Sequence, residues 1–136
     1  MARVLIVEDD DQVRVLAEGI LQDGGHKTLS AGSLDQALAL FEDGEPVDLI
    51  FTDISLQSDF QAGLMLAQEA IKRKIDVPVL YTTGQGITDG MQAMFVERFG
   101  FLAKPYTPEQ LLTAIENLLS SEGFFVTKEN YRHQVL

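Results

Sequence analysis

Short apolar runs alternate along this chain with segments whose apolar residues follow helical spacing. Three of the runs are nearly continuous, at residues 4–7, 49–51 and 77–81, and a weaker, more polar run covers residues 27–31. Continuous apolar runs of this length are typical of strands buried on both faces of a parallel sheet. A fifth strand is expected to end at Lys104 and Pro105. The alternation predicts an α/β fold around a five-stranded parallel sheet.

The segments between the runs predict five helices. Their apolar residues recur at helical spacing within residues 13–21, 34–41, 64–71, 87–95 and 111–119. Thr107 followed by Pro108 is a typical helix start, a capping residue and then a first-turn proline. Strands that alternate with helices in this way place helices on both faces of the sheet, so we expect a doubly wound α/β domain.

Length and charge narrow the function classes. With 136 residues, the chain is expected to form one domain over residues 1–120 and an extension over residues 121–136 that is too short for an output domain. The formal net charge of −11 argues against direct nucleic acid binding and against binding to anionic membranes. The absence of cysteine excludes disulfides and thiolate chemistry. Without an apolar run long enough for a membrane span or a secretory signal, we expect a soluble cytoplasmic protein.

Polar side chains follow the predicted strands at the points where these strands end. The first run leads into four acidic residues, Glu8–Asp11, and the third into Asp53; the fourth ends in Thr82 and Thr83, and the fifth in Lys104. Because the carboxyl ends of parallel strands share one edge of the sheet, we expect these side chains to lie together. Clustered carboxylates repel one another unless a cation bridges them, and oxygen ligands suit Mg²⁺. The sequence therefore predicts a magnesium site.

Asp53 is the predicted reactive group of this cluster. The Lys104 ammonium and the Thr83 hydroxyl, expected on the far side of Asp53 from the acidic pair, would complement negative charge added to its carboxylate. A carboxylate acts as a nucleophile in phosphoryl transfer when a metal ion and a lysine neutralise the transferred group. Asp53 is therefore a candidate phosphoryl acceptor.

This ordered set resembles the receiver domains of two-component response regulators, over residues 3–120. The matching positions are Glu8, Asp9, Asp53, Thr83, Lys104 and Pro105. The resemblance implies a flavodoxin-like strand order 2-1-3-4-5 and phosphorylation on Asp53. It further implies that Thr83 and Lys104 hold phosphoryl oxygens.

The resemblance also implies the details of the metal site and of the switch. Asp9 and Asp53 would bind Mg²⁺ directly, together with the main-chain carbonyl of Ser55, and Glu8 would act largely through water. Thr83 and the aromatic residue Phe101 would form the switch, and the Lys104–Pro105 peptide would be cis.

One departure from the family pattern concerns the loop after Asp53. In that family the loop usually has a proline four residues after the aspartate and a glycine about eight residues after it. This chain instead has Gln57 and reaches its glycine at Gly63, ten residues on, which predicts a longer loop.

The resemblance favours a single-domain, chemotaxis-regulator-like response regulator. It would accept a phosphoryl group from a histidine kinase or a histidine phosphotransfer domain and signal to an unknown downstream protein, as a monomer or as a phosphorylation-dependent dimer. It would not be an enzyme beyond catalysing its own phosphorylation and dephosphorylation. Its output surface is expected on helix 87–95, the last strand and helix 111–119, around Phe101 and extending to residues 121–136.

Three other interpretations stay open. A receiver-shaped interaction module that is not phosphorylated is the main alternative. A Mg²⁺-dependent phosphatase would need a second carboxylate two residues after Asp53, where this chain has Ser55. A flavin or nucleotide binder would need a Gly/Ser/Thr-rich loop after the first strand, where this chain has acidic residues that repel phosphate.

Overall fold

The computed structural model describes residues 2–56, 61–84 and 98–120. These residues contain one five-stranded parallel sheet with the strand order β2-β1-β3-β4-β5. The strands are β1 (Arg3–Val7), β2 (Lys27–Ala31), β3 (Leu49–Asp53), β4 (Val79–Thr83) and β5 (Phe99–Ala103). The predicted α/β class and the flavodoxin-like order are both confirmed.

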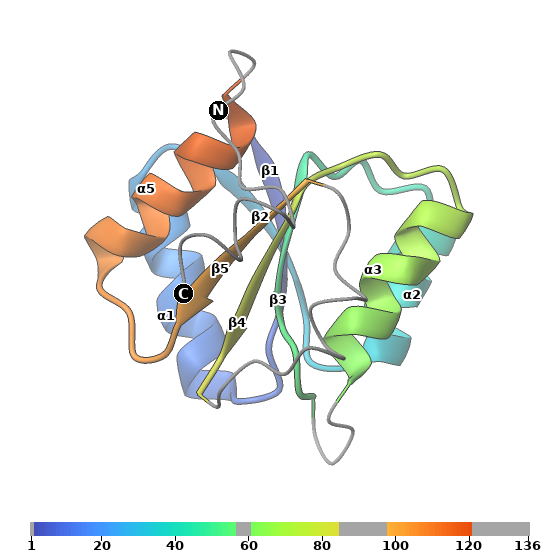
Figure 1. Cartoon of the computed structure of the whole chain (residues 1–136), viewed down its shortest axis with the longest axis horizontal. Coiled ribbons are helices and arrows are strands. Elements are labelled where there is room, and N and C mark those ends of the chain that lie inside the picture. Colours follow the sequence, from blue (N-terminus) through green and yellow to red (C-terminus); the bar gives the residue numbers. More distant parts are fainter. Residues whose placement is uncertain (1, 57–60, 85–97, 121–136) are drawn as a thin grey trace, which may run out of the picture.

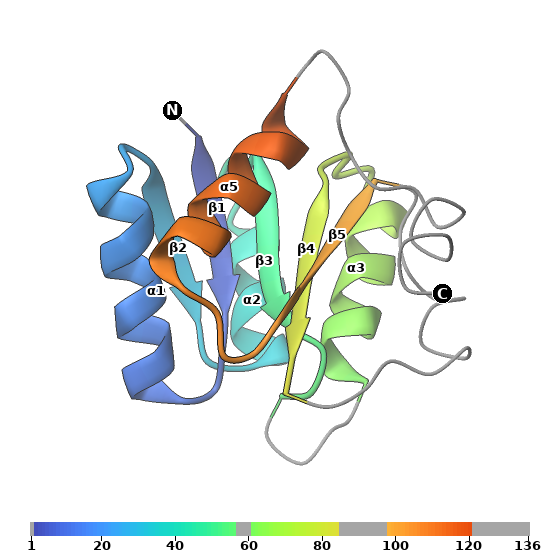
Figure 2. The ribbon, with the colours of Figure 1, turned by 60° about the vertical axis from the view of Figure 1, so that its left-hand side comes forward.

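Four helices lie in the described part of the chain. They are α1 (Asp11–Asp23), α2 (Leu34–Glu42), α3 (Ala62–Lys72) and α5 (Pro108–Leu119). In Figure 1, α1 and α5 cover one face of the sheet, and α2 and α3 cover the other. The turned view of Figure 2 shows α5 in front of the sheet and α2 behind it. The helix predicted at residues 87–95 lies outside the described residues.

Two apolar clusters, one on each face of the sheet, hold the helices in place. Alternate residues of a strand point to opposite faces, so β1 directs Leu5 and Val7 toward α2 and α3. Val4 and Ile6 point toward α1 and α5, where they meet Leu111 of α5. Because both faces are covered, the central strands are buried throughout, which explains their continuous apolar runs.

Local sequence signals explain where several elements begin. The Asp10 carboxylate caps α1 by accepting hydrogen bonds from the backbone N–H groups of Gln12 and Val13. The predicted start of α5 is confirmed: Thr107 is its N-cap and Pro108 its first residue, and Thr107 also forms a reciprocal capping box with Gln110. The run that begins at Val77 forms regular strand only from Val79, because Pro78 has no N–H group for the sheet ladder.

In the described part of the chain, none of the helices has the length and apolar character that a membrane span requires. Residues 121–136 lie outside the described residues, and so does the helix 87–95 part of the expected output surface. The described part of that surface consists of β5 and α5.

Candidate functional site

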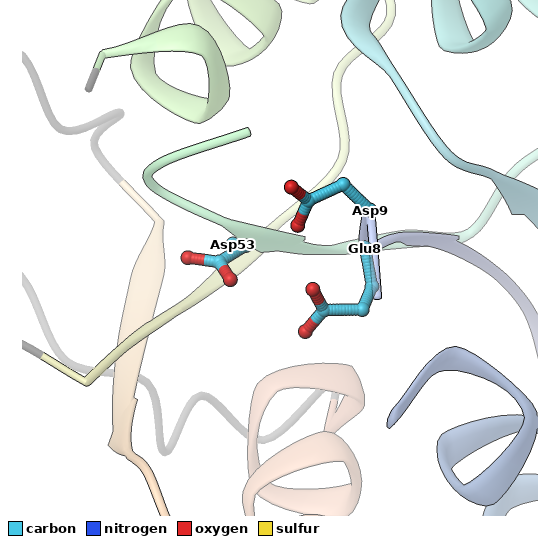
Figure 3. A group of neighbouring side chains, drawn as sticks. All are labelled: Glu8, Asp9 and Asp53. Carbon is cyan, nitrogen blue, oxygen red and sulfur yellow. The ribbon is translucent and has the colours of Figure 1, made fainter. Parts of the chain in front are cut away.

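Three carboxylates from two adjacent strands meet at the carboxyl edge of the sheet. Glu8 and Asp9 follow β1, and Asp53 ends β3. One carboxylate oxygen from each of the three lies within 4.8 Å of the others, and Figure 3 shows the Glu8 and Asp9 side chains on opposite sides of the chain, both facing Asp53. Glu8 and Asp53 are buried, whereas Asp9 is exposed. The sheet thus brings Glu8, Asp9 and Asp53 together. The other two residues of the acidic run lie elsewhere, because Asp10 caps α1 and Asp11 pairs with Arg14.

The strand register explains this meeting. Val7, the last residue of β1, pairs with Thr52 of β3. The residues that follow them, Glu8 and Asp53, therefore lie side by side. The N–H group of Glu8 donates to the carbonyl of Ala31 at 3.1 Å, which holds the start of the acidic loop against β2. Parallel pairing therefore places two carboxylates together at buried positions.

Lys104 reaches this cluster from the end of β5. Its backbone N–H group donates to the Thr83 carbonyl at 3.1 Å, and its ammonium lies 2.7 Å from both Glu8 Oε1 and Asp53 Oδ2. The expectation that Lys104 lies on the far side of Asp53 from the acidic pair is therefore wrong. Its side chain is long enough to contact both buried carboxylates, and a buried charge without a partner is strongly unfavourable.

Burial and pairing act in opposite directions on the pKa values of this cluster. Burial raises the pKa of Glu8, and the hydrogen bond from Lys104 offsets this rise only in part. Burial alone would lower the pKa of Lys104, but its hydrogen bonds to Asp53 and Glu8 outweigh burial and raise the pKa. Lys104 is therefore held in its charged form. Three carboxylates against one ammonium leave the cluster two formal negative charges when all are ionised.

The donor set of this cluster fits a divalent cation. Three carboxylates offer hard oxygen ligands within 4.8 Å of one another. Exposure of Asp9 leaves one side open to water, which suits Mg²⁺ because this ion retains part of its hydration shell. The N–H group of Ser55 donates to Asp53 Oδ1 at 3.2 Å, so Ser55 lies in the turn beside the cluster. The metal role of its carbonyl stays a prediction.

The two predicted switch residues lie on neighbouring strands. Thr83 is buried at the end of β4, one residue beyond Thr82, which pairs with Asp53 across the sheet. Phe101 lies in β5 opposite Tyr81. Its half-buried ring packs against the apolar cluster on the face of the sheet that α2 and α3 cover. The Lys104–Pro105 peptide is cis, as the resemblance implied.

Tyr106 is a neighbour of the site that sequence reasoning missed. Its ring stacks edge-on against Phe51 with a centroid distance of 5.8 Å. Burial raises the pKa of its phenol, as does the negative charge of Glu8 and, to a smaller extent, that of Asp53. The only available signal was its place two residues after Lys104, and that place alone does not indicate contact with the acidic cluster.

Comparison with known proteins adds independent findings. A family model for the response regulator receiver domain matches residues 4–116. The nitrogen assimilation regulatory protein NtrX of Azorhizobium caulinodans is 33% identical over 119 residues, which cover 87% of this chain and 26% of that protein. The chain therefore spans about a quarter of the length of this relative.

Solved structures give the same assignment. A response regulator receiver protein from Sinorhizobium medicae is 25% identical, with a TM-score of 0.78 and coverage of 90% of this chain and 97% of that one. The response regulator TrrA of Thermotoga maritima, solved in complex with Mg²⁺-BeF, is 26% identical, with a TM-score of 0.74 and coverage of 88% and 100%. Since the family model matches most of the chain, the protein belongs to the response regulator receiver domains of two-component signalling systems.

Proposed function

We propose that this receiver domain accepts a phosphoryl group on Asp53 in a Mg²⁺-dependent reaction and signals through phosphorylation-dependent protein contact. The donor is a phosphohistidine on a histidine kinase or a histidine phosphotransfer domain. One observation carries the proposal: the buried Asp53 carboxylate lies beside the acidic pair and 2.7 Å from the Lys104 ammonium. Such a carboxylate has partners for both a cation and an added phosphoryl group.

The chemistry balances without a further reactant. An Asp53 carboxylate oxygen attacks phosphorus, the new O–P bond forms as the P–N bond to histidine breaks, and the bonding electrons return to the imidazole nitrogen. That nitrogen then takes a proton from water. Lys104 is already charged and stays positive beside the transferred oxygens, which is the electrostatic stabilisation that phosphoryl transfer requires.

The acidic pair has a different part in the proposal. Asp9 and Asp53, with the Ser55 carbonyl, would hold Mg²⁺, and Glu8 would act through water. Bound Mg²⁺ supplies positive charge that offsets the charge on the phosphoryl oxygens. The solved TrrA complex with Mg²⁺-BeF supports this assignment by similarity, since beryllium fluoride has the tetrahedral shape of a phosphoryl group.

The remaining assignments concern signalling. Thr83, at the end of β4, would hold a phosphoryl oxygen and couple phosphorylation to Phe101 in β5. Residues 1–120 would form the receiver unit, acting in the cytoplasm as a monomer or a phosphorylation-dependent dimer. The downstream partner would be a protein, because a net charge of −11 opposes direct nucleic acid binding.

The test is incubation with a small phosphodonor and Mg²⁺, followed by intact-mass measurement. We expect the wild-type protein to gain the mass of one phosphoryl group and Asp53→Asn to gain none. Asp43→Asn is the matched control, because Asp43 is an exposed residue at the end of α2. Labelling of Asp53→Asn at the wild-type rate would overturn the site assignment. A wild-type protein that stays unlabelled would favour the alternative, a receiver-shaped module that is not phosphorylated.

A further inference from the structure

The backbone immediately after Asp53 is held from two sides. The N–H group of Ile54 donates to the Thr82 carbonyl of β4 at 2.9 Å, and the Ile54 carbonyl accepts from the N–H group of Gly63 at 2.9 Å. Ser55 in turn donates its N–H group to Asp53 Oδ1 at 3.2 Å. The direction of the Asp53 carboxylate therefore depends on where β4 and α3 hold this short stretch of backbone.

The first turn of α3 lies directly against this stretch. The helix has no side-chain cap at Gln61, so the Ile54 carbonyl satisfies one of the backbone N–H groups that every helix leaves unpaired at its start. This contact requires the helix backbone to approach the end of β3 closely. Gly63, the second residue of α3, makes the approach.

Gly63 has no room for a side chain. A Cβ atom added there would lie 2.0 Å from the Asp53 carbonyl oxygen and 2.9 Å from both the Asp53 carbonyl carbon and Ile54 Cα. Among the described glycines, only Gly63 would bring an added Cβ within 3.0 Å of backbone atoms. At Gly24 the nearest atom belongs to the flexible Leu112 side chain, which can move aside. At Gly63 the conflict is between two backbones, so either residues 53–54 or the first turn of α3 would have to move.

We propose that Gly63 is a positioning residue for the chemistry of Asp53, an inference that rests on the proposed function. Its missing side chain allows α3 to hold residues 53–55 where the Asp53 carboxylate meets both Lys104 and the acidic pair. The close approach of the two backbones leaves no space for a Cβ atom and therefore requires glycine at this position.

The size of the expected effect follows from the contact distance. Real Cβ atoms essentially never approach other heavy atoms within 3.0 Å, so a contact at 2.0 Å requires a displacement of about 1 Å. A misplacement of about 1 Å at a reacting group can lower a rate roughly 100-fold. Displacement of residues that orient metal ligands lowers metal affinity roughly 10- to 100-fold.

The test compares Gly63→Ala with Gly19→Ala. Gly19 lies inside α1, and an added Cβ there meets no atom within 4 Å, so the same substitution is made in a helix without a steric conflict. We expect Gly63→Ala to lower the phosphorylation rate of the folded protein by roughly 100-fold. Its Mg²⁺ dissociation constant, measured by NMR titration, should rise roughly 10-fold or more. Gly19→Ala should match the wild-type protein in both measurements.

The outcomes separate this inference from the proposed function. A Gly63→Ala protein that is less stable but keeps the wild-type rate and Mg²⁺ affinity would show that Gly63 serves packing alone and would overturn the inference. If the wild-type protein is not phosphorylated at all, the proposed function fails, and Mg²⁺ affinity still decides the role of Gly63.

A measurement on the wild-type protein covers the case in which Gly63→Ala does not fold. Because the N–H group of Gly63 donates to Ile54, its amide NMR signal should shift together with those of residues 53–55 when Mg²⁺ is added. The Gly19 signal should not shift. Shifts at residues 53–55 without one at Gly63 would contradict the proposed coupling.

Discussion

Leu49, Ile50 and Phe51 begin β3, and Thr52 and Asp53 end it; all five are buried, but only the first three are apolar. Burial of a large apolar side chain stabilises a fold by roughly 1.5–3 kcal/mol. Burial of a carboxylate destabilises it unless a partner compensates the charge. The apolar residues of β3 therefore stabilise the fold, whereas the buried carboxylate at its end destabilises the fold unless its charge is compensated.

Lys104 compensates the charge of the buried carboxylate at the end of β3. Its ammonium contacts Asp53 and Glu8 at 2.7 Å each, and the side chain is 25% exposed. The site therefore depends on the sheet in two ways. Burial of apolar side chains holds the strands in register. This register places the carboxylates of Glu8 and Asp53 next to the Lys104 ammonium. Substitution of an apolar residue of β3 and substitution of a charged partner of Asp53 should therefore lower the free energy of unfolding by different amounts and for different reasons.

The largest effect is expected at the apolar end. Leu49→Ala should lower the free energy of unfolding by about 2–5 kcal/mol, because Leu49 is 0% exposed and the substitution leaves a cavity. Leu16→Ala is the matched control, since Leu16 in α1 is 62% exposed and its loss should change stability by no more than about 0.5 kcal/mol. Urea unfolding measures both. Equal losses would show that apolar burial in β3 is not what supports the sheet.

A smaller effect is expected at the charged end. Lys104→Ala removes the ammonium from two buried carboxylates, and we expect a loss of about 1–3 kcal/mol, below the range for fully buried pairs because Lys104 is partly exposed. Lys72→Ala is the control: Lys72 is 73% exposed and pairs with Glu69 at 3.6 Å, a contact worth about 1 kcal/mol or less. Urea unfolding of both variants in the absence of Mg²⁺ measures their free energies of unfolding.

A gain in stability for Lys104→Ala would contradict its role as the compensating charge. If Lys104 also holds phosphoryl oxygens, the variant should lose more stability in its phosphorylated form than in its unphosphorylated form.

The smallest effect on stability is expected at the exposed acid. Asp9→Asn removes one of three neighbouring carboxylates and should change unfolding without metal by no more than about 0.5 kcal/mol. Mg²⁺ at ten times its dissociation constant should stabilise the wild-type protein by about 1.4 kcal/mol and the variant by less. Thermal unfolding with and without Mg²⁺ measures the difference, with Asp43→Asn as the control. Equal stabilisation of wild type and Asp9→Asn would exclude Asp9 as a metal ligand.

The fold followed from sequence patterns that act locally. Continuous apolar runs predicted the central strands, because strands covered on both faces have no solvent-facing side. Thr107 and Pro108 marked the start of α5 because capping involves only residues of the same turn. The apolar run from Val77 predicted too long a strand: β4 begins only at Val79, because Pro78 cannot donate a hydrogen bond to the sheet.

The sequence by itself determined which side chains stand at the carboxyl edge, because a residue at the end of a parallel strand lies there whatever its neighbours are. It did not determine the contacts among them. The tertiary structure alone places Lys104 against both Glu8 and Asp53, and Gly63 against the Asp53 carbonyl. These contacts join residues far apart in the chain at distances set by how helices and strands pack, and a difference of about 1 Å decides them.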